Sequence, residues 1–393
     1  MSQHLSWFLE IDSLLSATKK YWQCIAFNQR EIPWPELLSS LHALSDKQLE
    51  VIEHDQNKIY DFLSPFITEL ASARKLTIVE SKDAKNLSFP FWLTNGIKGN
   101  KLKQLESFVA HLSDETLPLL EWCAGKGHLG RMHAACNQTP VQSIEIRDDL
   151  VELGAELAKQ HRLDIDFYKV DALSSEAEKY VKTDQHAVAL HACGGLHQSL
   201  MRHAVAKNTH TVSISPCCYH LFQPSANYTA MSHAGKASNV YFSDSDLKLA
   251  LQETVTSGQR VARLRDIETH WRLAFDCLLD DVLNKTTYLP IPSAKKALFS
   301  GEFSDFCLWA AKQKNILLPD NINYAYYLEL GAKRKAITKR VELVRHGFRR
   351  LIELWLVLDR ALFLQDNGYK VSLYTFCDKQ VTPRNILIQA HKI

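Results

Sequence analysis

Short apolar runs alternate with amphipathic stretches through the middle of the chain. The runs occupy residues 118–122, 143–146, 166–170, 187–191 and 211–215, and each is too short for a helix. Stretches with helical spacing separate most of them, as at residues 149–161. Strands that alternate with helices predict parallel βαβ units with right-handed crossovers. The pattern therefore predicts an α/β fold with a doubly wound sheet.

The two ends of the chain predict further elements. Residues 1–90 follow mainly helical spacing, which predicts a helical N-terminal module. Residues 226–365 are mostly helical in pattern, after a first part rich in polar residues. Two late runs, at residues 369–376 and 386–390, would complete a seven-stranded sheet. We expect one module over residues 1–90 and one α/β domain over residues 91–393, with a helical insertion at about 226–365.

Composition narrows the class of protein. Of the 393 residues, 46% are hydrophobic and 23% are charged, which is typical of a soluble globular protein. A net charge of +2 gives no general attraction to nucleic acid or membrane. The 9 cysteines show no paired spacing, which favours reduced thiols. No signal peptide and no apolar run long enough to cross a bilayer stand out, so we expect a cytoplasmic protein.

A glycine-containing loop follows the first predicted strand, in the sequence EWCAGKGHLG at residues 121–130. Glycine permits a positive φ and a close approach by a ligand, and the next helix offers unpaired N–H groups at its start. Glu121 opens the loop. A carboxylate there would repel the pyrophosphate of NAD and attract an ammonium group. The loop therefore favours S-adenosylmethionine, a cationic sulfonium compound, over NAD.

Two further acidic residues close the next two strands. Glu145 lies about twenty residues after the glycines, where an acidic residue binds ribose hydroxyls in Rossmann-type sites. Asp171, followed by Ala172, comes after the third strand and is placed to accept a hydrogen bond from the adenine amine. The alternative is that Glu145 and Asp171 are helix caps or solvated charges.

At these residues the sequence resembles a known family. CAGKGHLG at residues 123–130 resembles motif I of one branch of class I methyltransferases. The branch includes methyltransferase-like proteins described as carrying an rRNA adenine dimethylase domain and, more distantly, tRNA ribose 2′-O-methyltransferases. Four other segments are similar to motifs of that branch: GNKLKQ at 99–104, HACGGL at 191–196, PCCYHL at 216–221 and TPRN at 382–385.

The resemblance implies a Rossmann-like, seven-stranded methyltransferase sheet that binds S-adenosyl-L-methionine. It adds Lys101 and His191 to the residues expected around this cofactor. The predicted cofactor-binding residues are Lys101, Glu121, Cys123, Ala124, Gly125, Gly127, Glu145, Asp171, Ala172 and His191. The chain departs from the tRNA ribose enzymes because it lacks their N-terminal zinc-finger cysteines, which argues against a tRNA ribose substrate.

The methyl acceptor is expected beside the fourth and fifth strands, because ligands of open α/β sheets bind at the carboxyl ends of strands. We predict His191, Tyr219 and His220 as catalytic residues, with either histidine as the base. The alternative is that each histidine fixes a loop through a hydrogen bond.

The cysteines near these residues admit two other chemistries. Cys217 resembles the nucleophile of a cytosine-C5 mechanism, but the acidic residue expected just before it is absent. His191, Cys193, Cys217 and His220 are suitable zinc ligands, but they lack paired CxxC spacing. We therefore predict no metal and treat the cysteines as small buried residues.

A basic stripe is predicted on one helix over residues 332–355. Lys335, Lys339, Arg349 and Arg350 would lie opposite its apolar face and contact RNA phosphates, or form an ordinary solvated surface. We expect an S-adenosylmethionine-dependent methyltransferase that acts on RNA. The alternatives are a protein or small-molecule methyltransferase, and a non-catalytic RNA- or partner-binding protein on the same scaffold; a NAD-dependent oxidoreductase is disfavoured.

Overall fold

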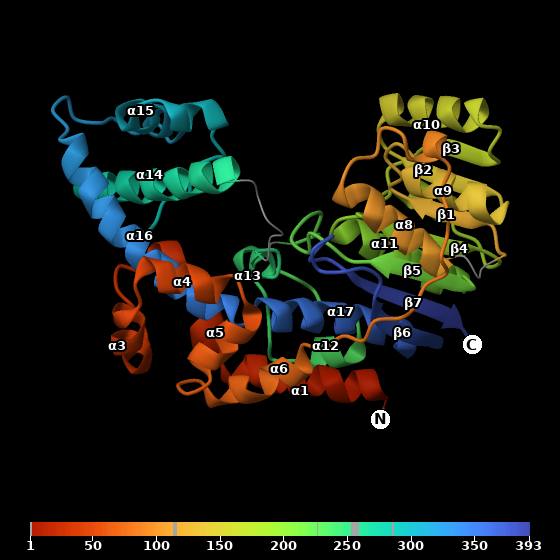
Figure 1. Cartoon of the computed structure of the whole chain (residues 1–393), viewed down its shortest axis with the longest axis horizontal. Coiled ribbons are helices and arrows are strands. Elements are labelled where there is room, and N and C mark those ends of the chain that lie inside the picture. Colours follow the sequence, from red (N-terminus) through yellow and green to blue (C-terminus); the bar gives the residue numbers. More distant parts are fainter. Residues whose placement is uncertain (1, 113–115, 226, 253–258, 285–286) are drawn as a thin grey trace. The chain divides into compact units, whose positions relative to one another are not determined.

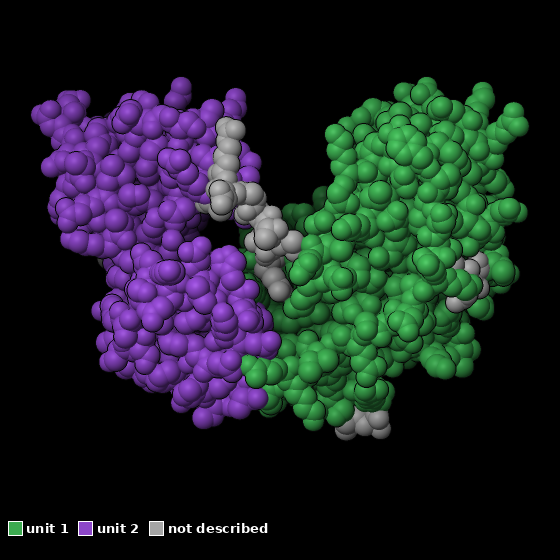
Figure 2. All heavy atoms as spheres, in the orientation of Figure 1, with its two compact units in different colours: residues 1–17, 72–255, 349–393 green, residues 18–71, 256–348 purple. Residues whose placement is uncertain are grey.

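A computed structural model describes residues 2–112, 116–225, 227–252, 259–284 and 287–393 of the chain. The chain divides into two compact units (Figure 2). Unit 1 comprises residues 1–17, 72–255 and 349–393, and unit 2 comprises residues 18–71 and 256–348. The predicted module 1–90 does not coincide with either unit, because its residues are divided between both.

Unit 1 contains the sheet. Its strands are β1 Leu119–Trp122, β2 Val141–Glu145, β3 Ile165–Lys169, β4 His186–Leu190, β5 Thr211–Ser215, β6 Tyr369–Thr375 and β7 Ile386–Lys392. Its helices are α1 Gln3–Ala17, α6 Ala73–Leu76, α7 Phe91–Thr94, α8 Asn100–Leu112, α9 His128–Asn137, α10 Asp148–Gln160, α11 Gly195–Lys207, α12 His233–Ala237, α13 Asp244–Leu249 and α17 Arg349–Asp366. Each predicted strand is present within two residues of its expected bounds.

The seven strands form one mixed sheet in the order β3-β2-β1-β4-β5-β7-β6 (Figure 1). Strands β1 to β5 pair in parallel, whereas β7 pairs antiparallel with both β5 and β6. The order reverses at β1 and β4, and that is where an open α/β sheet binds its ligand. The predicted α/β fold class is confirmed.

Helices cover both faces of this sheet. On one face, α8, α9 and α10 bury a cluster that includes Phe108, Met132 and Val188. Helices α9 and α10 approach β3 closely because Gly127 and Gly154 both lie against the ring of Phe167, where a Cβ atom would come within 2.3 and 2.4 Å of it. On the other face, α11 packs on β4 and β5, and α17 packs on β6 and β7. The sheet is therefore doubly wound.

Helix α17 is buried along almost its whole length. Its Trp355 packs against Phe8 of α1 and donates a hydrogen bond from Nε1 to Asp12 Oδ1 at 2.7 Å. Its Arg360 is fully buried and donates to His197 Nε2 at 2.6 Å and to the hydroxyl of Tyr228 at 3.1 Å. The contacts of Trp355 join α1 to unit 1.

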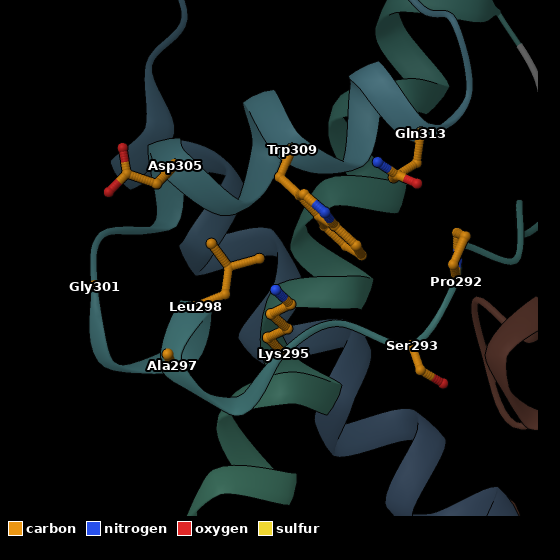
Figure 3. Close-up of a pocket in the computed structure, with 9 residues that line it drawn as sticks. All are labelled: Pro292, Ser293, Lys295, Ala297, Leu298, Gly301, Asp305, Trp309 and Gln313. Atoms are coloured by element: carbon orange, nitrogen blue, oxygen red, sulfur yellow. The ribbon is translucent and has the colours of Figure 1, made fainter.

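Unit 2 is helical in the residues that the structure describes. Its elements are α2 Lys19–Trp22, η1 Ala26–Asn28, α3 Pro35–Ala43, α4 Asp46–Glu53, α5 Gln56–Leu63, η2 Thr68–Ser72 (whose last residue belongs to unit 1), α14 Gln259–Leu283, η4 Lys296–Ser300, α15 Phe303–Gln313 and α16 Tyr324–His346. Between η4 and α15 lies a cavity of about 650 Å³, whose lining includes Lys295, Leu298 and Trp309 (Figure 3). None of the predicted site residues lines it.

Arginines of α16 join the two sequence segments of unit 2. Arg334 donates to the backbone carbonyl of Phe27 at 2.7 Å, and Arg340 donates to the carbonyls of Leu41 at 2.9 Å and Leu44 at 2.6 Å. Helical spacing shows which face of a helix is buried but not which distant helix covers it. This is why the sequence alone suggested a single module over residues 1–90.

The predicted helix over residues 332–355 is two helices. Helix α16 ends at His346 and α17 begins at Arg349, and the break at Gly347 and Phe348 coincides with the boundary between the units. Gly347 lies against Leu63, where a Cβ atom would approach its Cδ1 within 2.8 Å. The single-helix prediction was wrong because the apolar pattern continues across the break.

Within the described residues, no helix combines the length and apolarity that crossing a membrane requires.

We expect Gly331→Ala to destabilise unit 2, because a Cβ atom at Gly331 of α16 would lie 2.5–2.8 Å from backbone and Cβ atoms of Ala274 in α14. The overpacking should lower the free energy of unfolding by about 1–3 kcal/mol, even though alanine favours a helix by about 1 kcal/mol over glycine. Denaturant unfolding measures the effect. Ala332→Ser, at the next and exposed position, is the control and should change stability by less than about 0.5 kcal/mol. Equal effects of the two substitutions would contradict the close helix contact.

Candidate functional site

The glycine-containing loop connects β1 to α9. Cys123, Gly125 and Gly127 have φ values of +59°, +58° and +64°. The loop is held by two backbone hydrogen bonds, from the N–H of Ala124 to the carbonyl of Ile144 and from the N–H of Gly127 to the carbonyl of Ala124, both 2.9 Å. No atom lies within 4 Å of the position of a Cβ on Gly125, so that side of the loop is open.

Glu145 connects this loop to the end of β2. Its Oε2 accepts the N–H of Gly125 at 2.9 Å, and its Oε1 accepts the N–H groups of Ile146 at 3.0 Å and Arg147 at 3.2 Å. The side chain is almost fully buried. The carboxylate is therefore fixed beside the loop by three backbone donors.

Asp171 and Ala172 follow β3 at the same edge of the sheet. Asp171 is exposed, and its Oδ1 accepts the N–H of Leu173 at 2.9 Å, as in a turn. Ala172 is buried, and its carbonyl accepts the hydroxyl of Ser199 at 2.9 Å. Among the described residues, no other hydrogen bond to this carboxylate is present.

Cys123 lies at the centre of this group. Burial raises the pKa of its thiol, and the nearby charges of Glu145, Cys193, Asp171 and Glu121 raise it further. The acidic residues of the first three strands therefore surround one loop residue. The thiol is neutral at physiological pH.

Glu121 lies beneath the first turn of α9 and is almost fully buried. Its Oε2 accepts the hydroxyl of Ser143 at 2.8 Å, and a Cβ atom on Gly130 would come within 2.6 Å of it. Burial raises the pKa of Glu121 to about 7, although Ser143, the Gly130 N–H and the charges of Arg131 and Lys101 act in the opposite direction. The N-terminus of α9 thus already faces a carboxylate, which disfavours an additional phosphate.

Two cations lie near Glu121. Lys101 is an exposed residue at the start of α8, where partial desolvation lowers the pKa of its ammonium group although Glu121 and Cys217 oppose the shift. Arg131 of α9 is buried. Its Nε donates to the carbonyl of Gly127 at 3.3 Å, and its Nη2 lies 2.7 Å from Nδ1 of His128. Lys101 was predicted from a motif, but Arg131 was not, because its contact with the carbonyl of Gly127 forms only once α9 is folded.

His191 follows β4 with a φ of +68°, and its Nε2 lies 2.8 Å from Oε1 of Gln104 in α8. Desolvation, with the nearby charge of Lys101, lowers the pKa of His191 to about 4. The ring is therefore neutral at pH 7, donates from Nε2 and keeps an unprotonated Nδ1. Gln104 is buried, whereas His191 is exposed, and among the described residues Nε2 of Gln104 has no hydrogen-bond partner. Gln104 is the last residue of the GNKLKQ motif at residues 99–104, but it was not among the predicted site residues.

Tyr219 and His220 follow β5. The buried hydroxyl of Tyr219 has no hydrogen-bond partner among the residues that the structure describes, and burial with the nearby charge of Glu353 raises the pKa of this hydroxyl. The guanidinium of Arg360 lies 5.1 Å from the centre of the Tyr219 ring. Nδ1 of His220 is likewise buried, with no hydrogen-bond partner in the described part of the chain. Tyr219 is fully buried, whereas His220 is half-buried.

Of the four residues that the sequence suggested as zinc ligands, the two cysteines lie together and the two histidines lie outside their group. Cys193, Cys217 and Cys218 form one group, with ligand atoms all within 4.8 Å of one another. Among the described residues, neither His191 nor His220 belongs to that group.

The predicted basic stripe is corrected. Lys335 and Lys339 both bind the carboxylate of Asp266, at 2.7 and 2.9 Å, whereas Arg349 and Arg350 are almost fully buried in unit 1. Arg350 also forms an ion pair with Glu353 at 2.6 Å. The four cations therefore do not form one exposed face, because the pattern that suggested it spans the break between α16 and α17.

Comparison with known proteins bears on the same segment. Residues 98–225 match a family model described as a methyltransferase domain, which leaves most of the chain outside the match. No curated protein matches the chain.

Three solved structures show partial similarity. The PH0226 protein from Pyrococcus horikoshii OT3 has 14% identity and a TM-score of 0.26, over 32% of this chain and 62% of that one. The Pyrococcus abyssi tRNA (uracil-54, C5)-methyltransferase, solved with S-adenosyl-L-homocysteine, has 17% identity and a TM-score of 0.26, over 31% of each chain. The 23S rRNA methyltransferase ErmE has 20% identity and a TM-score of 0.24, over 28% of this chain and 44% of that one. The chain spans less than two thirds of the length of these structures, and TM-scores this low support no function.

We expect Glu121→Gln to stabilise the protein at high pH. The carboxyl group is protonated in both states below pH 4.5, ionises only in the unfolded state between 4.5 and about 7, and ionises in both states above that. Stability is therefore lost as the pH rises through this window. The amide keeps an acceptor for Ser143 and does not ionise. Its advantage over the native protein should grow by about 2 kcal/mol between pH 5 and pH 8.

Chemical denaturation at the two pH values measures this advantage. Glu152→Gln, at an exposed position of α10, is the matched control and should show no pH-dependent difference. An advantage of Glu121→Gln that is equal at both pH values would show that Glu121 does not titrate near neutrality.

Proposed function

We propose that the protein is an S-adenosylmethionine-dependent methyltransferase. The observation that carries this proposal is the position of Glu145, whose carboxylate joins the end of β2 to the glycine loop through the 2.9 Å hydrogen bond from Gly125. A carboxylate beside an open glycine loop at the switch point of the sheet is suited to the hydroxyls of a ribose. The match of residues 98–225 to a methyltransferase-domain model supports the same class.

The residues of the site fit this cofactor better than they fit a dinucleotide. The space beside Gly125 is open, Glu145 faces the loop, and Asp171 has unused acceptors for an adenine amine. Glu121, with Lys101 nearby, would bind the amino-acid end, since an ammonium and a carboxylate require charges of both signs. A pyrophosphate would instead meet Glu121 beneath the N-terminus of α9.

When bound, the cofactor supplies an electrophilic methyl group, and the protein has to position the acceptor and remove its proton. His191 is the residue that we assign to the second task. Its Nε2 is held by Gln104, so the ring presents a neutral Nδ1 in a fixed orientation. A neutral imidazole is able to accept the proton that the acceptor loses as the methyl group is transferred.

RNA is the acceptor class that we propose, on the resemblance of the motifs at residues 123–130, 191–196 and 216–221 to RNA methyltransferases. The test is to incubate the full chain with radiolabelled S-adenosylmethionine and, separately, total RNA, protein extract and metabolites. Label in RNA alone is expected. Label only in protein or metabolites would show that the protein is a methyltransferase with an acceptor other than RNA. Binding of cofactor without label in any pool would favour a non-catalytic scaffold.

We expect Glu145→Gln to lower the affinity for S-adenosylmethionine by at least about tenfold. The amide has one acceptor oxygen where three backbone N–H groups now converge, and its own N–H₂ would face a donor. The loop would lose an anchor, and the ribose hydroxyls would lose a charged acceptor, whose hydrogen bonds contribute about 1.5–3 kcal/mol. Isothermal titration calorimetry with S-adenosylmethionine measures the change.

The control for this measurement is again Glu152→Gln, which should bind as the native protein does. NAD serves as the second ligand and should give no binding heat with either protein. Native affinity in Glu145→Gln, or tighter binding of NAD than of S-adenosylmethionine, would overturn the assignment of the cofactor.

A further inference from the structure

Three thiols meet where β4 and β5 end. Cys193 follows β4, and Cys217 and Cys218 follow β5. Their Sγ atoms all lie within 4.8 Å of one another, and those of Cys193 and Cys217 are 3.6 Å apart. No other histidine, cysteine, aspartate or glutamate among the described residues belongs to this group.

The backbone holds the two loops together. The N–H of Gly194 donates to the carbonyl of Cys217 at 3.1 Å, and the N–H of Gly195 donates to that of Leu221 at 2.9 Å. A Cβ atom on Gly194 would come within 1.8 Å of the Leu221 oxygen, so only glycine permits this approach. The thiols are thus brought together by loop contacts that do not depend on the thiols themselves.

Cys218 has a φ of +43°, which is a strained conformation for a residue with a side chain. Such strain costs about 1–3 kcal/mol and persists where the surroundings impose it, often at functional sites. Here the strained residue carries the third thiol of the group.

The spacing of the sulfur atoms suits a shared metal ion. Zinc–thiolate bonds of about 2.3 Å in a tetrahedron place two sulfur atoms roughly 3.8 Å apart. The 3.6 Å between Cys193 and Cys217 is close to that value. Thiolates are preferred ligands of zinc, and three protein ligands leave one position for a water or another molecule.

We propose that Cys193, Cys217 and Cys218 bind one zinc ion, with the fourth coordination position open. The three thiols lose their protons on binding, so the ion and three thiolates together carry a charge of −1. Arg384 lies near Cys218 and Lys101 lies near Cys217, so that two cations partly offset this charge. The inference differs from the sequence prediction of no metal, because spacing along the chain does not reveal that two strand ends meet. It does not depend on the proposed methyl transfer.

The test uses the full chain, reduced, stripped of metal with a chelator and titrated with Co²⁺, whose thiolate complexes absorb in the near ultraviolet. One equivalent should produce this absorption, and Zn²⁺ should displace it. Cys193→Ser and Cys217→Ser should each weaken Co²⁺ binding by more than about 100-fold. This loss is larger than the one expected when a residue that only hydrogen-bonds to a metal ligand is replaced. Cys136→Ser, at a half-exposed cysteine of α9, is the control and should bind as the native protein does.

Absence of the absorption in the native chain, or its full retention in Cys193→Ser, would overturn the proposal. Alkylation of the native protein, read by mass spectrometry, covers the case in which a variant does not fold. Zn²⁺ should protect Cys193, Cys217 and Cys218 but not Cys136, and equal labelling with and without Zn²⁺ would also refute the site. Calorimetry with S-adenosylmethionine on the same samples keeps the cofactor and metal questions separate.

Discussion

The carboxylate of Glu145 accepts three backbone hydrogen bonds, and the geometry of the candidate site depends on it. One oxygen binds the glycine loop after β1 and the other binds the turn after β2. These are hydrogen bonds to a charged acceptor, and such bonds contribute about 1.5–3 kcal/mol each. The same carboxylate thus satisfies the loop and stands at the open side of Gly125. Structural need and the proposed binding of ribose coincide in one side chain.

In Glu121, by contrast, the stability of the fold and the proposed function are opposed. Its burial costs stability at neutral pH, as the rise of its pKa to about 7 indicates, although Ser143 and two cations partly offset the cost. Substitutions that remove such a cost commonly stabilise a protein and impair its function. Keeping an unfavourable carboxyl beneath α9 is consistent with a role that an amide would not fulfil, namely attraction of a cationic ligand.

Helix α17 connects the site to the rest of unit 1. It lies against β6 and β7, and it buries Arg360, which contacts His197 of α11 and lies over the ring of Tyr219. A buried arginine that lost these partners would be strongly destabilising, so the positions of α11 and of the loop after β5 are coupled. This coupling fixes the loop that carries Cys217 and Cys218 opposite the loop that carries Cys193.

The sequence by itself determined the local elements and the chemical types of the site. Apolar runs of strand length predicted all seven strands, and the glycines with Glu121, Glu145 and Asp171 marked the loop edge, because these signals depend only on nearby residues. Tertiary structure alone decided which distant segments pack together. It placed residues 18–71 against α16, buried Arg349 and Arg350, paired His191 with Gln104, and gathered three cysteines from two strand ends. Periodicity reports that a face is buried, whereas its partner is set by the path of the whole chain.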